Sequence, residues 1–224
     1  MVRNHRFLKF AQWALILTGL TLLGFWTGVR IQGAYGKDAD IRRFEAARLE
    51  LQETTGPTAT PTPPLVLESN LPLDMSLWAE GRIEEYQESL HHSLNTPLAI
   101  LRIPKINLEV AVLSGTSELV LNRGVGHITG TPLPGEGGNI GIAGHRDGYF
   151  RGLKDVVEGD FLELETLTDK ETYAITGIFL VDPPDVWVLE PTERPAITLV
   201  TCYPFYFVGS APQRYIVRAE RVGS

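Results

Sequence analysis

The chain has 224 residues, of which 43% are hydrophobic and 21% charged, which excludes a wholly disordered or a collagen-like protein. Its formal net charge of -7 argues against a general nucleic-acid-binding protein, so we expect no nucleic-acid partner. A single cysteine excludes an internal disulfide and a cysteine-rich zinc site.

The N-terminal residues have the pattern of a membrane anchor. Residues 10–29 (FAQWALILTGLTLLGFWTGV) carry no charge, and a helix of this length spans roughly 30 Å, the thickness of bilayer hydrocarbon. Basic residues in the preceding segment 1–9 predict a cytoplasmic tail and an extracytoplasmic remainder, that is, a single-pass cell-membrane protein. A cleaved signal peptide is the alternative, but it would have a shorter apolar region and a small-residue cleavage site.

Residues 30–64 are expected to form an extracytoplasmic stalk and linker. The charged segment 37–53 has Ile41, Phe44 and Ala47 at helical spacing and is interpreted as a solvated stalk. Residues 54–64 (TTGPTATPTPP) form a Pro/Thr spacer, which in polyproline form extends about 3.1 Å per residue.

A helical extension is predicted over residues 65–96. Its helix covers residues 76–94, with Ser76 as a candidate N-cap and an interior Gly81 that costs about 1 kcal/mol against Ala. The apolar face of this helix should dock on the domain that follows.

Residues 97–224 predict a mainly β domain, because short apolar runs alternate with glycine and proline. A short helix is expected over residues 117–122, stopping at Gly124. The spacing predicts an antiparallel barrel or sandwich. The candidate strands are Ala99–Ile103, Glu109–Leu113, Asn139–Ala143, Phe161–Leu164, Thr172–Val181, Ala196–Thr201 and Tyr215–Ala219.

Cys202 and Arg214 are the first candidate catalytic residues. Cys202 ends one strand and Arg214 begins the next, so a hairpin would bring both to one rim of the sheet. Strand alternation places Cys202 with Thr198 and Val200, which predicts a groove on the outer wall of the barrel. A guanidinium beside a thiol favours the thiolate and supplies paired donors to an oxyanion.

A proton carrier is also needed, and His145 is the best candidate. It follows a strand in the run GNIGIAGHRD, where Asp147 is placed either to orient the ring or to form a turn. His127 is the other histidine of the strand-rich region. Each of these residues also has a structural interpretation: a lone Cys is more often a small buried hydrophobe, and a lone His or Arg is usually structural or solvated. A free thiol in an exported domain nevertheless favours a function, because an idle one is open to oxidation.

Three motifs in this order resemble the sortases, and class D members in particular. They are GHRD at 144–147, TLVTC at 198–202 and APQRYIV at 211–217, within a resemblance over about residues 97–221. The resemblance implies a closed eight-stranded β-barrel with short helices.

The resemblance also implies a set of roles. Cys202 would attack the carbonyl after the Thr of a Leu-Pro-x-Thr-Gly/Ala-like sorting signal, His145 would act as general acid and then base, and Arg214 would stabilise the oxyanion. Thr201 would help to bind the substrate or complete the oxyanion hole. The other substrate-binding residues would be Asp147 and, from the loop 182–195, Val186, Trp187 and Leu189. The acyl group would pass from a Cys thioester to an amine of cell-wall peptide or of a protein subunit. The expected partners are therefore surface proteins that carry the signal and an amine acceptor, and we expect no metal and no organic cofactor.

Other classes of protein compete with this interpretation. A papain-like protease would place Cys before His in a C-G-S-C-W context, and an L,D-transpeptidase would carry Ser-His-Gly-Cys; neither run is present in the sequence. A non-catalytic, membrane-tethered β-domain, such as an adhesin or scaffold, fits the composition equally well.

Overall fold

The fold is taken from a computed structural model, which describes residues 12–13, 15–21, 39–54, 73–206 and 209–223. Parts of the expected anchor, and the expected Pro/Thr linker beyond Thr54, lie outside the described residues. Residues 12–13 and 15–21 are helical. Within the described ranges, no helix combines the length and the apolar character that a membrane crossing requires.

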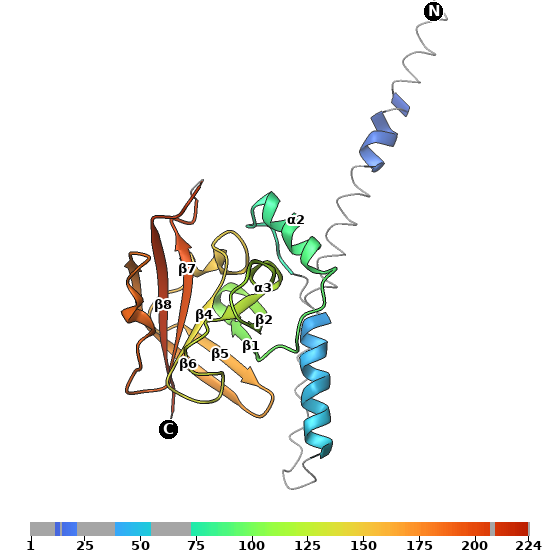
Figure 1. The fold of residues 1–224 in the computed structure, drawn as a ribbon. Helices are drawn as coiled ribbons and strands as arrows, with labels where there is room; N and C mark the ends of the chain where they lie inside the picture. The colour runs from blue at the N-terminus through green and yellow to red at the C-terminus, as the bar shows by residue number, and fades with distance from the viewer. Residues whose placement is uncertain (1–11, 14, 22–38, 55–72, 207–208, 224) are drawn as a thin grey trace, which may run out of the picture.

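Eight strands close into a barrel in the order β1-β2-β3-β4-β7-β8-β6-β5. Figure 1 shows the barrel with most of its strands labelled. The expected closed eight-stranded barrel is confirmed. The strand bounds are β1 Ala99–Ile103, β2 Leu108–Ser114, β3 Val125–His127, β4 Asn139–Ala143, β5 Phe161–Thr166, β6 Lys170–Val181, β7 Ala196–Tyr203 and β8 Gln213–Arg221.

The barrel differs from the sequence-based expectation in two ways. Strand β3 was not predicted, because it has three residues with a glycine at its centre and depends on its neighbours for pairing. The barrel is also not wholly antiparallel, since β2 pairs with β3 and β4 pairs with β7 in parallel. The parallel β4–β7 pair matters for function, because it makes the C-terminal ends of these two strands neighbours.

Two short helices lie together on one side of the barrel, as Figure 1 shows, and short 3-10 turns lie elsewhere around it. Helix α2 (Glu80–Ser89) begins later than predicted: its N-cap is Ala79 and not Ser76, and the N–H of Ala79 donates to the carbonyl oxygen of Asp147. Helix α3 (Glu118–Arg123) begins at Ser117, whose hydroxyl accepts from the Val120 N–H, and ends at Gly124 as predicted. Three 3-10 turns complete the set: η1 Pro104–Ile106, η2 Tyr149–Asp155 and η3 Val186–Leu189.

The α2 segment docks on the barrel through aromatic side chains, as expected. Tyr86 is fully buried, and its ring lies edge-on to Trp78 with 5.6 Å between the ring centroids. Trp78 also lies edge-on to Tyr149 of η2, at 4.8 Å. The extension is thereby fixed against the segment that follows β4.

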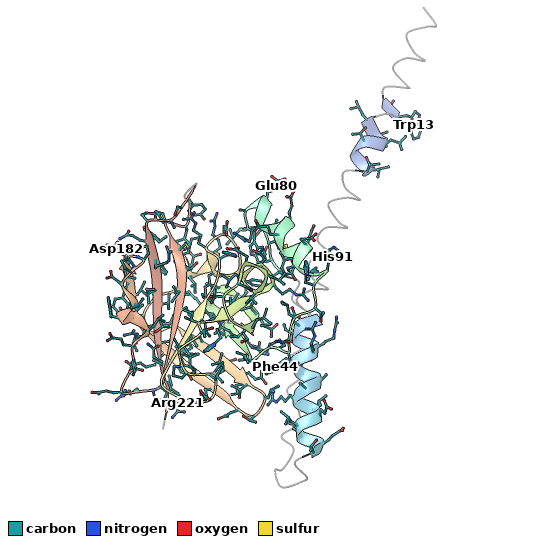
Figure 2. All side chains as sticks on the ribbon, in the orientation of Figure 1. Trp13, Phe44, Glu80, His91, Asp182 and Arg221 are labelled. Carbon is teal, nitrogen blue, oxygen red and sulfur yellow. The ribbon has the colours of Figure 1, made fainter. Side chains whose placement is uncertain are left out.

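The helix of residues 39–54 is not a solvated stalk, and this corrects the expectation. Phe44 and Ile41 are 1% and 6% exposed and pack with Ile100 of β1 and Ala111 of β2. Figure 2 labels Phe44 on this helix beside the barrel. Asp40 forms a buried ion pair with Arg123 of α3, with 2.6 Å between Nε and Oδ2. An apolar stripe and a paired buried charge together hold the helix on the domain.

Candidate functional site

Cys202 and Arg214 are direct cross-strand partners. Strands β7 and β8 are antiparallel, and their register sets Cys202 opposite Arg214, one pair before the end of the ladder. Directly opposed residues have Cβ atoms about 4.5–5.5 Å apart. The hairpin expected from the sequence therefore forms, and it brings the thiol and the guanidinium to one rim.

Cys202 lies on the outward face of the barrel. Ile197 and Leu199 of β7 belong to the barrel core, whereas Val200, on the same face as Cys202, packs with Ile216 and Val188 in a separate cluster. Because side chains alternate along a strand, Cys202 shares the face of this outer cluster. Cys202 is a free thiol of intermediate exposure, so it is accessible from outside the barrel.

His145 lies at the same rim through the parallel β4–β7 pair. The last register pair of these strands is Ala143 with Val200, and His145 and Cys202 each follow two residues later. The Gly144 N–H donates to the Val200 carbonyl oxygen at 3.1 Å, so the contact continues past Ala143. Neighbouring strands are about 4.8 Å apart, so the imidazole and the thiol are carried on adjacent strand ends.

Gly144 allows the turn that presents His145. A Cβ added at this position would lie 2.7 Å from a ring carbon of Phe150, which is fully buried. A larger residue would push the backbone away from Phe150 and move the histidine that follows. The glycine in the GHRD run is thus explained by packing.

The environment of His145 favours the neutral imidazole. Burial lowers its pKa from the usual value, and the nearby Arg82 guanidinium lowers it further. Carboxylates oppose this shift, and that of Glu118 lies nearest, with 3.6 Å between Oε2 and Nε2. In the described part of the chain Nε2 is buried and has no hydrogen-bond partner, so its hydrogen-bonding capacity is not used within the protein.

The Arg214 guanidinium is held by backbone carbonyl oxygens. Its Nη1 donates to the carbonyl oxygens of Gln213 at 3.2 Å and Ala211 at 3.4 Å. Among the described residues, no carboxylate lies within ion-pair distance of it. Its charge is therefore available to a developing oxyanion.

Thr201 and Asp147 differ from their expected places. Thr201 is 2% exposed on the inward face, and its hydroxyl donates to the Gly144 carbonyl oxygen at 2.7 Å. This hydroxyl therefore holds the residue before His145, and it points away from the outer face that carries Cys202. The Asp147 carboxylate accepts from Nε of Arg82 at 3.1 Å, so its hydrogen-bond partner is α2 and not the His145 ring.

The connection between β6 and β7 folds over the face that carries Cys202. Its turn η3 exposes Val186 and Trp187, at 66% and 45%, whereas Leu189 is partly buried against the outer cluster. Gly141 of β4 makes room for this packing, because a Cβ there would lie 3.0 Å from Leu189. Two of the three predicted apolar residues are thus free to contact a ligand.

Sequence reasoning missed two charged residues beside His145. Arg82 comes from α2 and Glu118 from the first turn of α3, and no local pattern places either near the site. The alternative histidine, His127, is structural: it is 5% exposed, and its Nε2 lies 3.0 Å from the Pro132 carbonyl oxygen and 3.1 Å from the Thr131 hydroxyl.

Comparison with known proteins identifies the family. The sortase domain model matches residues 101–222. The chain is 41% identical over 124 residues to Sortase D of Bacillus subtilis (strain 168) and 31% identical over 129 residues to Sortase A of Bacillus anthracis. The matched regions cover 55% of this chain in both cases, and 63% and 59% of those relatives.

Solved structures agree with this assignment. A Clostridium perfringens Sortase D5 transpeptidase is 34% identical with a TM-score of 0.53, over 62% of this chain and 88% of that chain. Sortase C-1 from Actinomyces oris is 28% identical with a TM-score of 0.54, over 80% of this chain and 98% of that chain. The family model, the relatives and the barrel all lead to one conclusion: the chain belongs to the sortase family.

Proposed function

We propose that this protein is a cysteine transpeptidase that cleaves a Leu-Pro-x-Thr-Gly/Ala-like sorting signal after its Thr and transfers the acyl group to an amine. The observation that carries the proposal is the convergence of Cys202, His145 and Arg214 on adjacent ends of β4, β7 and β8. The Clostridium perfringens Sortase D5, described as a transpeptidase, supports the same reaction class.

The first half-reaction forms a thioester. A neutral His145 takes the proton of the Cys202 thiol, and the thiolate attacks the carbonyl carbon of the Thr residue. Arg214 donates to the oxyanion of the tetrahedral intermediate. The C–N bond then breaks, and the imidazolium gives its proton to the departing amine.

The second half-reaction reverses these roles. An incoming amine attacks the thioester carbonyl and passes a proton to His145. The intermediate collapses and expels the Cys202 thiolate, which recovers the proton. Attack by water instead of an amine would give hydrolysis by the same steps, so the same residues serve both outcomes.

We also propose that the enzyme works at the outer face of the cell membrane. The uncharged run 10–29 and the basic residues before it support a single-pass anchor with a cytoplasmic N-terminus. Its partners would be surface proteins that carry the sorting signal, and an amine from cell-wall peptide or a protein subunit.

A peptide assay tests the reaction. The full-length chain in detergent is incubated with Leu-Pro-x-Thr-Gly/Ala peptides and a primary amine, and mass spectrometry follows the product and any acyl-enzyme. We expect an amide product and an acyl adduct on Cys202, and neither with Cys202→Ala. Equal turnover by wild type and Cys202→Ala would reject the proposal in favour of a non-catalytic domain.

A further inference from the structure

We propose that Asn139, oriented by Thr198, is a positioning residue that fixes η3 as the substrate-facing wall beside Cys202. The proposal rests on the proposed function, since it assigns the residues that hold the wall for the sorting peptide. None of them belongs to the catalytic group of Cys202, His145 and Arg214.

A buried amide anchors the β6–β7 connection to the barrel. Asn139 is fully buried, and its Nδ2 donates to the carbonyl oxygens of Val188 at 3.0 Å and Glu190 at 2.9 Å. These acceptors lie about fifty residues away in sequence and flank the end of η3. One side chain thereby satisfies two loop carbonyl groups that the barrel strands do not pair.

Thr198 sets the orientation of this amide. Its hydroxyl donates to Oδ1 of Asn139 at 2.7 Å, and Thr198 is itself fully buried. Carbonyl oxygens only accept hydrogen bonds, so Nδ2 must face Val188 and Glu190 while Oδ1 faces the hydroxyl. Without the Thr198 hydroxyl, the buried Oδ1 loses its donor and the amide is no longer fixed.

Arg218 also bonds to the backbone of η3 and lies near its exposed Trp187 side chain. It is the cross-strand partner of Thr198, and its Nη2 donates to the same Val188 carbonyl oxygen. Its guanidinium carbon lies 5.9 Å from the Trp187 ring centroid, while Phe179 lies edge-on to that ring, also at 5.9 Å. The anchor therefore places Trp187 as well as the loop backbone.

The anchored wall and the nucleophile share one face. Thr198, Val200 and Cys202 alternate outward along β7, so Thr198 lies four residues before Cys202 on the same surface, roughly 13 Å away at about 3.3 Å per residue. Val188 is buried, but Val186 and Trp187 beside it are exposed. Rigidly held apolar side chains next to a nucleophile suit an extended peptide with apolar residues before the scissile bond.

Paired threonine variants test whether Thr198 and Asn139 hold η3 in place. Thr198→Val removes the hydroxyl at nearly constant volume, and Thr198→Ser restores it. The matched control is Thr166→Val on β5, a strand that borders neither β4, β7 nor β8; its buried hydroxyl also bonds locally, to the Asp169 backbone. Each full-length variant in detergent is assayed with the Leu-Pro-x-Thr-Gly/Ala peptides, and Cys202 is titrated with iodoacetamide.

For Thr198→Val we expect the peptide KM to rise about tenfold, which is the effect of one lost hydrogen bond. The kcat and the alkylation rate of Cys202 should stay within about twofold of wild type, because the catalytic group is not touched. Thr198→Ser and Thr166→Val should keep the wild-type KM. A fall in kcat at constant KM, or an equal effect of Thr166→Val, would overturn the proposal.

Amide hydrogen exchange separates this proposal from the proposed function. Exchange in residues 182–190 should quicken in Thr198→Val and in Asn139→Ala, and stay unchanged in Thr198→Ser and Thr166→Val. This measurement needs no turnover, so it tests whether Asn139 and Thr198 hold η3 even if no peptide is cleaved. Unchanged exchange in both anchor variants would refute the positioning role.

Discussion

Cys202 and Arg214 form the last outward-facing cross-strand pair of β7 and β8, so the sulfur and the guanidinium are placed by one antiparallel ladder. The guanidinium is oriented by the Gln213 and Ala211 carbonyl oxygens, which leaves its remaining N–H groups for an oxyanion. Such donors act by geometry as well as by charge.

Arg214→Lys should therefore be a poor substitute. A lysine keeps the charge but loses the planar pair of donors, and we expect kcat/KM to fall about 100- to 1000-fold. Steady-state kinetics with the sorting peptide measure this. The control is Arg221→Lys near the other end of β8, where the arginine pairs with Glu171, and there kcat/KM should stay within twofold. Comparable losses in the two variants would mean that the effect is not catalytic.

The charges around His145 predict two opposite pH shifts. Arg82 lowers the pKa of His145, and Glu118 raises it, with Asp147 and Glu85 acting in the same sense as Glu118. Arg82→Gln should therefore raise the His145 pKa, and Glu118→Gln should lower it. Because the neutral imidazole is the base, the acid limb of kcat/KM should move to higher pH in the first variant and to lower pH in the second.

The ring signal of His145 in an NMR titration, identified by its loss in His145→Gln, gives the pKa directly. Shifts of the same sign in both variants would contradict the electrostatic account. A shift in the rate profile without one in the ring titration would assign the acid limb to another group.

The helix of residues 39–54 should stay on the domain after the chain is cut. Its buried ion pair and the Phe44 contact are each of a kind whose loss costs about 3–5 kcal/mol. With a protease site placed in the 57–62 segment of the full-length chain in detergent, the N-terminal fragment should remain with the C-terminally tagged fragment after cleavage.

Asp40→Ala and Phe44→Ala should release the fragment, whereas Glu50→Ala, at an exposed position of the same helix, should not. Release from the cut wild-type chain would show that the helix is a stalk after all. If the fragment is retained, the Pro/Thr run joins two segments that are docked on each other, the helix of residues 39–54 and the barrel domain. The chain that separates the expected membrane anchor from the domain is then residues 30–38 and not the longer linker.

Strand positions were predictable where alternation and turn residues agree. Strands β1 and β4 have the bounds that the sequence predicts, and the hairpin of β7 and β8 follows from Cys202 and Arg214 at its ends. The convergence of His145 was not predictable, because it depends on the parallel β4–β7 pairing between segments far apart in the chain. Only the closed barrel makes these strands neighbours.

Two other differences between the sequence-based predictions and the structure have separate physical causes. The docking of the helix 39–54 depends on a buried partner, Arg123, that lies 83 residues away from Asp40, so its short apolar stripe alone suggests a solvated helix. Thr201 is different, since alternation already groups it with Ile197 and Leu199, which face the core. The inward direction of its side chain was therefore already present in the pattern.

Thr201 should instead act on catalysis through His145. Its hydroxyl holds the Gly144 carbonyl oxygen, and Gly144 itself bonds to Val200, so the residue before the histidine is tied to β7 on both sides. Thr201→Val keeps the volume but leaves that carbonyl without its donor, and a displacement of about 1 Å at a catalytic group can cost roughly 100-fold in rate. We expect kcat to fall about 10- to 100-fold with KM within twofold, and Thr201→Ser to restore kcat. A rise in KM at constant kcat would instead return Thr201 to the substrate-binding residues, because it would show that the hydroxyl contributes to holding the peptide.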